Sequence, residues 1–268
     1  GNASDMSGNG YDGTPQNGVA TVLDRKGTAG KAYGFDGTDD LLDMGNQWGN
    51  FGTNPVTISV WLKRNTNDNV DAILGKGNYG APNWYFRTNH PEGGTNNKIN
   101  FLFRSESETR EIFSNASLST GTWYHVVAQR DGSAMSIYVD GQLDKSEASS
   151  PISADSSVNV KFGYADSWVV NDMRANGSID EVRIYDRALS AVEVAALYNL
   201  ENTPPNQAPA FAGGSSFTTA ENNALASFIV GATDPDGDSL NYTATGPDAD
   251  KFDVNVNTGE LTFKNAPD

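Results

Sequence analysis

The sequence predicts an all-β protein that contains an antiparallel sandwich or jelly roll and, after a linker, a second small β domain. Two observations predict this fold class: short segments in which β-branched and aromatic residues recur with period two, and the Asp-Gly turns between them. A third observation, three prolines within residues 203–209 (TPPNQAP), predicts an extended connector. The length of 268 residues suits one large β domain or two smaller ones.

The strands expected in the first domain are residues 57–62 (TISVWL), 98–103 (KINFLF), 123–128 (WYHVVA) and 135–139 (MSIYV). Asp-Gly pairs at 36–37, 131–132 and 140–141 supply the turn residues that tight hairpins need. We expect Trp61 and Trp123 to lie in the core, because both sit inside alternating strands.

One helix is predicted, directly before the linker. Ser190 is placed to cap residues 191–200 (AVEVAALYNL), and Glu193 completes a capping box. After the linker, short strand-like segments are divided by residues 234–238 (DPDGD) and 257–260 (NTGE). Because a β-sandwich usually needs about 100 residues, we expect a jelly roll over 1–202, a linker over 203–209 and a partial β-sandwich over 210–268.

Composition limits the function. The formal charge is −16, with 18 basic and 34 acidic residues, which argues against nucleic acid and anionic membranes as partners and favours divalent cations. No apolar run approaches the roughly 20 residues that cross a bilayer, so no membrane insertion is expected. The absence of cysteine excludes a disulfide framework and thiol catalysis.

Four motifs, in order, resemble the laminin G-like, concanavalin A-like jelly-roll family over about residues 1–200. They are residues 31–40 (KAYGFDGTDD), 122–127 (TWYHVV), 137–141 (IYVDG) and 177–190 (GSIDEVRIYDRALS). The resemblance implies a jelly-roll sandwich whose first strand is missing from this sequence. It also implies a structural Ca²⁺ held by Asp180, with Asn2, Asp5 and Asp36 as the nearest matches to its partners. From the residues alone, Asp36 starts an Asp-Gly turn and Asp5 forms an Asx-turn.

Residues 206–209 (NQAP), 220–222 (AEN), 233–238 (TDPDGD) and 258–262 (TGELT) resemble the opening half of a bacterial cadherin-like repeat. This implies a partial Greek-key sandwich from a large bacterial protein. The acids Asp234, Asp236 and Asp238 alternate around a glycine turn, and Glu221 precedes them; such oxygen density suits Ca²⁺, while an acidic turn is the alternative. By resemblance these acids bind Ca²⁺ between repeats, and Asp268 starts a further ligand motif.

Sugar recognition needs exposed aromatic rings together with polar groups that take hydroxyls. One candidate group contains Tyr164, Trp168, Asn171, Asp172 and Arg174, in a polar loop between two strands. A second group contains Tyr79, Trp84 and Arg87. Loop packing is the alternative for the tryptophans. Arginine beside amides would suit an acidic glycan.

Catalysis is not expected. Glu106, Glu108 and Glu111 superficially resemble the acid pattern of jelly-roll glycosidases, but they fall at a predicted hairpin tip and the flanking positions are polar. His125 alternates within a strand and His90 precedes a proline, and neither neighbours a nucleophile in sequence.

The sequence therefore predicts a non-catalytic, calcium-binding carbohydrate or adhesion module of a large secreted or cell-surface protein. Its expected partners are a polysaccharide or cell-surface glycan and neighbouring repeats of the same protein. Two alternatives stay open: a structural or protein-binding adhesion segment, and an accessory module of a polysaccharide-degrading enzyme.

Overall fold

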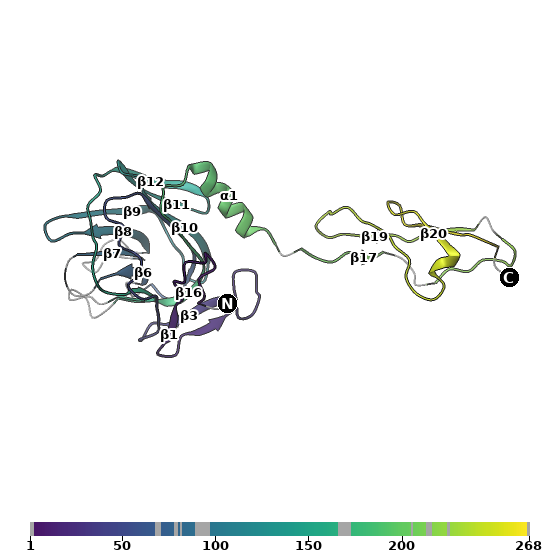
Figure 1. Ribbon diagram of the computed structural model, residues 1–268, viewed down its shortest axis with the longest axis horizontal. Helices are drawn as coiled ribbons and strands as arrows, with labels where there is room; N and C mark the ends of the chain where they lie inside the picture. The colour runs from purple at the N-terminus through teal and green to yellow at the C-terminus, as the bar shows by residue number, and fades with distance from the viewer. Residues whose placement is uncertain are drawn as a thin grey trace. The chain divides into compact units, whose positions relative to one another are not determined.

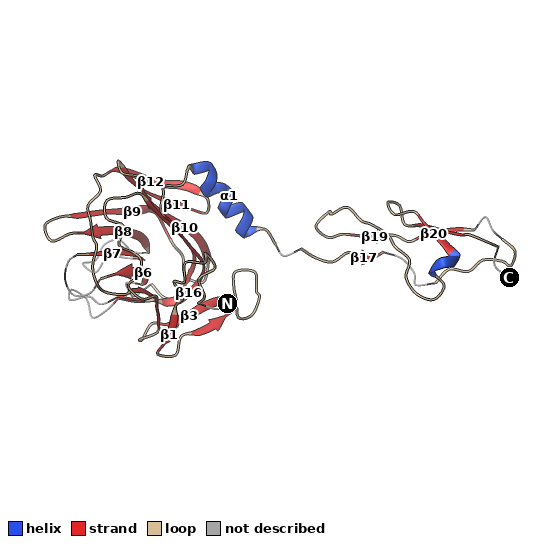
Figure 2. Ribbon diagram, viewed as in Figure 1, coloured by secondary structure: helices blue, strands red, loops and turns tan. Residues whose placement is uncertain are grey.

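The computed structural model describes residues 3–67, 71–77, 80, 82–88, 97–165, 173–204, 206–212, 216–223 and 226–266. The chain divides into two compact units, Gly1–Thr203 and Pro204–Asp268 (Figure 1). Strands dominate the secondary structure, as Figure 2 shows, and the predicted all-β class is confirmed.

Two antiparallel sheets, A and B, form the first unit. Across sheet A, the strands follow the order β1 (Thr14–Gln16), β4 (Leu41–Asp43), β13 (Val160–Phe162), β6 (Ala72–Lys76), β7 (Asn83–Thr88), β8 (Lys98–Arg104) and β9 (Thr109–Ser117). Across sheet B, the order is β12 (Gln142–Ala148), β11 (Ala134–Val139), β10 (Trp123–Arg130), β5 (Val56–Arg64), β16 (Asn176–Tyr185), β3 (Ala32–Asp36) and β2 (Ala20–Val22). A short hairpin, β14 (Tyr164–Ala165) and β15 (Met173–Arg174), follows β13.

The core lies between the two sheets because each strand directs alternate side chains inward. Sheet A contributes Trp84, Phe86, Phe101 and Phe103, and sheet B contributes the apolar side chains of β5 and β10. Trp61 is buried as predicted, with 4% of its surface exposed. Trp123 is only half-buried and lies 5.3 Å from the Lys63 ammonium, so its prediction as a core residue is wrong. Strand alternation is the reason: Tyr124, Val126 and Ala128 point into the core, so Trp123 lies on the outer face of sheet B beside Lys63.

Helix α1 (Ala191–Asn202) packs on the outer side of sheet B, beside β10 to β12 (Figure 1). The predicted capping box is confirmed: the Glu193 amide donates to Ser190 Oγ, and the Ser190 amide donates to the Glu193 carboxylate. Val194 and Leu197 face the sheet. In the part of the chain that the structure describes, no helix is long and apolar enough to cross a membrane.

Two buried cations hold the loop of residues 46–54 against the end of the sandwich. Lys76 Nζ donates to the carbonyl oxygens of Asn46 and Trp48, at 3.2 and 2.8 Å. The Arg130 guanidinium donates to four carbonyls, at Phe51, Gly52, Asn54 and Ile152, and lies 4.0 Å from the Phe103 ring. Burial lowers the pKa of Arg130 to about 10, so it stays charged at neutral pH.

The second unit holds β17 (Ala210–Phe211) paired with β19 (Ala232–Thr233), and a three-stranded sheet of β18 (Ser227–Ile229), β21 (Glu260–Phe263) and β20 (Phe252–Val254). A single 3-10 turn, Ala249–Lys251, precedes β20. Aromatic contacts within the second unit join Phe217 to Phe228, Phe228 to Phe263, and Phe263 to Phe252.

Arg130→Met should lower the free energy of unfolding of the first unit by about 3 kcal/mol, because buried carbonyls would lose their charged donor. Thermal unfolding measures this as a fall in Tm of roughly 6 to 12 °C. Arg110→Met is the control, since Arg110 is a partly exposed surface residue whose ion pair with Glu108 should contribute less than about 1 kcal/mol. Equal effects of both substitutions would contradict the role assigned to Arg130.

Candidate functional site: the outer face of sheet A

The outer face of sheet A is the side turned away from the core, and six neighbouring strands align their residues across it. Cross-strand pairing places the following residues in one row: Asp43, Lys161, Gly75, Tyr85, Leu102 and Glu111. Because these residues are direct partners in register, their side chains share one face.

Glycines make room for Tyr85 in this row. A Cβ atom on Gly75 would lie 2.4 Å from Cδ1 of Tyr85, and one on Gly77 would lie 2.9 Å from its hydroxyl oxygen. The phenol ring therefore lies across strand β6, over positions where any side chain would collide with it.

A second row contains Arg87 and Asn100. Arg87 Nε donates to the Asn100 side-chain oxygen at 2.8 Å, and Asn100 Nδ2 donates to the Glu111 carboxylate at 3.2 Å. Burial lowers the pKa of Arg87 to about 10, and the Glu111 charge opposes this shift, so Arg87 carries its charge at neutral pH.

The hairpin β14–β15 lies on this face. Ala165 and Met173 pack against Ala72, Tyr85 and Leu102, and Met173 Sδ lies 3.2 Å from a guanidinium nitrogen of Arg87.

The neighbouring hairpin positions, Tyr164 and Arg174, pair with each other and stay half-buried. Strand alternation turns them away from the sheet. The Lys161 ammonium lies 5.1 Å from the centre of the Tyr164 ring, and the Arg174 guanidinium carbon lies 6.0 Å from it. We call Lys161, Tyr164 and Arg174 the tyrosine platform.

The structure thus brings Arg87, Tyr164 and Arg174, which came from two separate sequence groups, to one face. Trp84 does not join them: its ring is fully buried against Phe51 and Phe103, so it cannot stack on a sugar. The physical reason is strand geometry, since residues three positions apart in a strand point to opposite faces. Tyr79, Trp168, Asn171 and Asp172 lie outside the described residues.

Tyr85, Asn100 and Lys161 were not singled out from the sequence, and Glu111 was considered only as part of a glycosidase-like acid pattern. Alternation within residues 83–88 (NWYFRT) does separate Trp84 and Phe86 from Tyr85 and Arg87. That pattern does not show which strands lie beside each other. The cross-strand row of residues therefore could not be predicted from the sequence.

Among the described residues, Asp180 belongs to no convergent group of three acids. Asp180 forms an ion pair with Arg25 at 2.9 Å, and both side chains are buried. Burial raises the pKa of Asp180 to about 6, which the Arg25 charge partly offsets. In the pairing of β3 with β16, Asp36 lies opposite Asn176. Asn176 is four residues from Asp180 along β16, so Asp36 and Asp180 are separated by about 13 Å along the strand. The cation beside Asp180 is therefore a guanidinium.

Asp5 organises its own loop: its carboxylate accepts hydrogen bonds from the Ser7 hydroxyl, the Ser7 amide and the Tyr11 amide, which lower its pKa to about 2. Asp5 thus forms the Asx-turn that its own sequence suggested. Asn2 lies outside the described residues.

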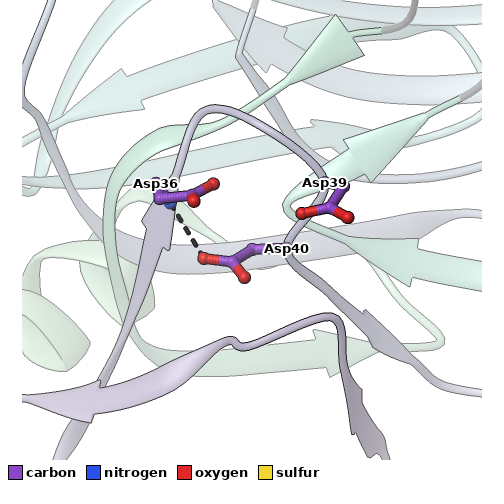
Figure 3. Close-up of side chains that lie close together, drawn as sticks. All are labelled: Asp36, Asp39 and Asp40. Carbon is purple, nitrogen blue, oxygen red and sulfur yellow. Dashed lines mark hydrogen bonds between the residues drawn. The ribbon is translucent and has the colours of Figure 1, made fainter.

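Three acids of the β3–β4 turn do converge: Asp36, Asp39 and Asp40 each place one carboxylate oxygen within 4.8 Å of the others (Figure 3). Asp40 Oδ2 also accepts the Asp36 amide at 3.0 Å. Burial raises the pKa of Asp40, and the charges of Asp36 and Asp39 add to the shift. Among the described residues this is the one group of three acidic, histidine or cysteine ligands that meets this distance, and its hard oxygens fit Ca²⁺.

The acids of the second unit are arranged differently. Asp234 Oδ1 accepts the amides of Asp236 and Asp238, which is the acidic-turn alternative, and the Asp236 carboxylate accepts the Gln207 amide at 2.6 Å. Neither these three acids nor Glu221 belong to the convergent group found among the described residues. Asp268 lies outside them.

A groove of about 520 Å³ also opens in the second unit. Asp234 and Asp238 line it together with Phe211, Leu240 and Tyr242.

A buried polar cluster fastens the end of helix α1 to sheet B. The Glu201 carboxylate accepts Trp61 Nε1 and Arg183 Nε, both at 2.6 Å. The Trp61 ring stacks on Tyr198 at 5.7 Å, and the Arg25 guanidinium lies 4.6 Å from the Trp61 ring and donates to the Glu201 carbonyl oxygen. We call this arrangement the helix clamp.

His125 lies within the clamp. It is fully buried, its Nε2 is 2.8 Å from Ser59 Oγ, and its pKa falls to about 4 because burial and the charges of Arg25 and Arg183 oppose protonation. At this pKa His125 is neutral at pH 7, and its Nε2 lies 3.6 Å from the Glu201 carboxylate. His90 lies outside the described residues.

The three glutamates do not form a catalytic pair. Glu106 and Glu108 are exposed at the turn between β8 and β9, where Glu108 pairs with Arg110, while Glu111 lies in β9 beside Asn100.

A family model described as the concanavalin A-like lectin/glucanases superfamily, of laminin G type, matches residues 36–195, and the chain belongs to this family. No curated protein sequence matches the chain.

Solved structures share the fold. Domain 4 of AbnA, an extracellular GH43 arabinanase from Geobacillus stearothermophilus solved with arabinotriose, is 22% identical over 74% of this chain and 93% of its own, with a TM-score of 0.57. The binding domain of Paraclostridial Mosquitocidal Protein 1 is 18% identical over 74% of this chain, with a TM-score of 0.59. The binding domain of botulinum neurotoxin serotype G is 18% identical over 72%, with a TM-score of 0.52. The chain spans about half the length of these two toxin domains, 49% and 48%.

The helix clamp predicts that the difference in free energy of unfolding between the native protein and His125→Gln depends on pH. Between pH 6.5 and 4 the unfolded chain binds a proton at this histidine and the folded chain does not, so the native protein loses stability as pH falls. Asp180 acts in the opposite direction, because its raised pKa favours the folded state as pH falls from about 6 to 3.8. As pH falls from 6.5 to 4, the free energy of unfolding of the native protein should fall by roughly 3 kcal/mol relative to that of His125→Gln.

Urea unfolding at several pH values measures that difference. His90→Gln is the matched control. A constant difference between the native protein and His125→Gln across the window would contradict a neutral buried histidine.

Proposed function

We propose that the first unit is a non-catalytic carbohydrate-binding module of a secreted or cell-surface protein and that it binds glycan on the outer face of sheet A. The observation that carries this proposal is the tyrosine platform, a half-buried aromatic ring with two cationic side chains beside it. The family and the neighbour solved with arabinotriose support it. The extracellular arabinanase and the toxin binding domains support a secreted location.

The platform has the chemistry that sugar recognition requires. The apolar face of a pyranose or furanose ring stacks on Tyr164, and Lys161 and Arg174 donate hydrogen bonds to ring substituents. Arg87 and Asn100 act indirectly: Arg87 contacts Met173, which fixes the hairpin on the sheet. The exposed Glu111 carboxylate accepts hydroxyl hydrogen bonds at the far end of the row.

Two wider roles follow from the same proposal. The likeness to one domain of a polysaccharide-degrading enzyme favours an accessory module that holds such an enzyme on its substrate. The second unit, by its repeat-like motifs and its small sheets, supports a cadherin-like spacer with neighbouring repeats as partners, and hence an adhesion role.

Affinity electrophoresis of the whole chain against neutral and acidic polysaccharides tests the binding proposal. We expect retardation by at least one polysaccharide, and we expect Tyr164→Ala to abolish it, because loss of the ring costs about 1 to 3 kcal/mol of contact. Tyr242→Ala, in the second unit, is the control and should bind as the native protein does. Retardation that survives Tyr164→Ala, or none with any glycan from a folded protein, would contradict the proposal.

We also propose that Ca²⁺ stabilises this module and that Asp36, Asp39 and Asp40 hold it. The ion would supply positive charge to three crowded carboxylates and would fix the β3–β4 turn. The proposal leaves Asp180 out, because its carboxylate pairs with Arg25.

Calcium should therefore raise the Tm of the native protein, and EDTA should reverse the effect. Asp39→Asn should abolish this calcium-dependent shift, whereas Asp24→Asn, in the turn of residues 24–28 that the proposal leaves out, should retain it. A shift that Asp39→Asn leaves intact, or no shift at all in about 5 mM Ca²⁺, would overturn the assignment.

A further inference from the structure

Basic side chains gather on the outer face of sheet A although the chain carries a net charge of −16. The alternation of side chains along the strands, together with the β14–β15 hairpin, places both basic and acidic residues on this face. The basic residues described on this face are Arg87, Lys98, Arg104, Lys161 and Arg174, and the acidic ones are Asp43 and Glu111. The described residues of this face thus oppose the sign of the whole protein.

The two acids are engaged by amide groups. Asn159 Nδ2 lies 2.8 and 3.0 Å from the two Asp43 carboxylate oxygens, and the Gly45 amide donates to Asp43 at 2.9 Å. Glu111 accepts from Asn100. These carboxylates are therefore held by hydrogen-bond donors on the sheet and its flanking loops.

Two cations lie over the Tyr164 ring. Lys161 Nζ is 5.1 Å from the ring centroid, and the guanidinium carbon of Arg174 is 6.0 Å from it. In a hexuronate the carboxylate projects from the edge of the ring, so a sugar that docks at Tyr164 brings that group next to these two cations. A guanidinium there binds a carboxylate through two parallel hydrogen bonds, and an ammonium adds a point charge.

We propose that the ligand of this face is an anionic polysaccharide whose residues carry carboxylates, with Lys161 and Arg174 as its charge-reading residues. The inference rests on the proposed function and adds the ligand class to it. Because the rest of the protein repels polyanions, recognition depends on short-range contacts at this face, and salt that screens the long-range repulsion should not abolish it.

A matched pair of ligands isolates the carboxylate. Polygalacturonate and its fully methyl-esterified form share a backbone and differ in charge. In EDTA and about 150 mM NaCl, which screens the long-range repulsion from the net charge, the whole chain should bind the acidic form at least tenfold more tightly.

Substitutions that remove one charge test whether Lys161 and Arg174 cause the preference for the acidic polysaccharide. Lys161→Gln and Arg174→Gln should each weaken binding to polygalacturonate about fivefold or more and leave binding to the ester within about twofold. Lys26→Gln, an exposed residue in a turn of the sheet B side, is the control and should change neither. Thermal unfolding of each variant verifies that it is folded.

The outcomes separate the two proposals. Equal binding to both forms, or a preference that Lys161→Gln and Arg174→Gln leave unchanged, overturns the anionic ligand and leaves the carbohydrate-binding function standing. Binding to neither form and to no neutral glycan overturns both.

Discussion

The two-residue alternation of the sheet A strands is the constraint on which both core and site depend. Each strand has to line the hydrophobic core with one set of side chains and build the outer face with the other. In β7 the inward Trp84 and Phe86 are fully buried, while the outward Tyr85 and Arg87 form the floor of the candidate site. A shift of one residue in the register would exchange the two sets, so the hydrophobic core fixes the position of every residue of the site.

The protein meets the cost of buried charge by giving each buried ion several hydrogen-bonding partners. Lys76 and Arg130 bind backbone carbonyls of one loop, and Arg25 joins the Asp180 carboxylate to the end of helix α1. Removing one partner from such an arrangement leaves the other buried and unsatisfied, which explains why these residues should matter more than surface ion pairs. These cations hold loops and elements together in the way that a bound metal ion would.

The sequence predicted the all-β class, the strands and the helix with its capping box because those features depend on local pattern and propensity. It also singled out Tyr164, Arg174 and Arg87 by residue type, and the structure brings them to one face. It placed Trp84 in the wrong environment because aromatic content was weighed above strand parity. It could not foresee Arg25 beside Asp180, since a contact between residues 155 positions apart has no local signal. The convergence of Asp36, Asp39 and Asp40 depends on a turn conformation that the Asp-Gly motif only partly specifies.

The central claim is that one face of the first unit, the outer face of sheet A, holds the ligand. Amide hydrogen exchange of the whole chain, with and without a saturating oligosaccharide, tests it most directly. We expect slower exchange in β7, β13 and the hairpin of Tyr164 and Arg174, and unchanged exchange in helix α1 and in residues 206–266. Protection confined to sheet B or to the second unit would contradict the account.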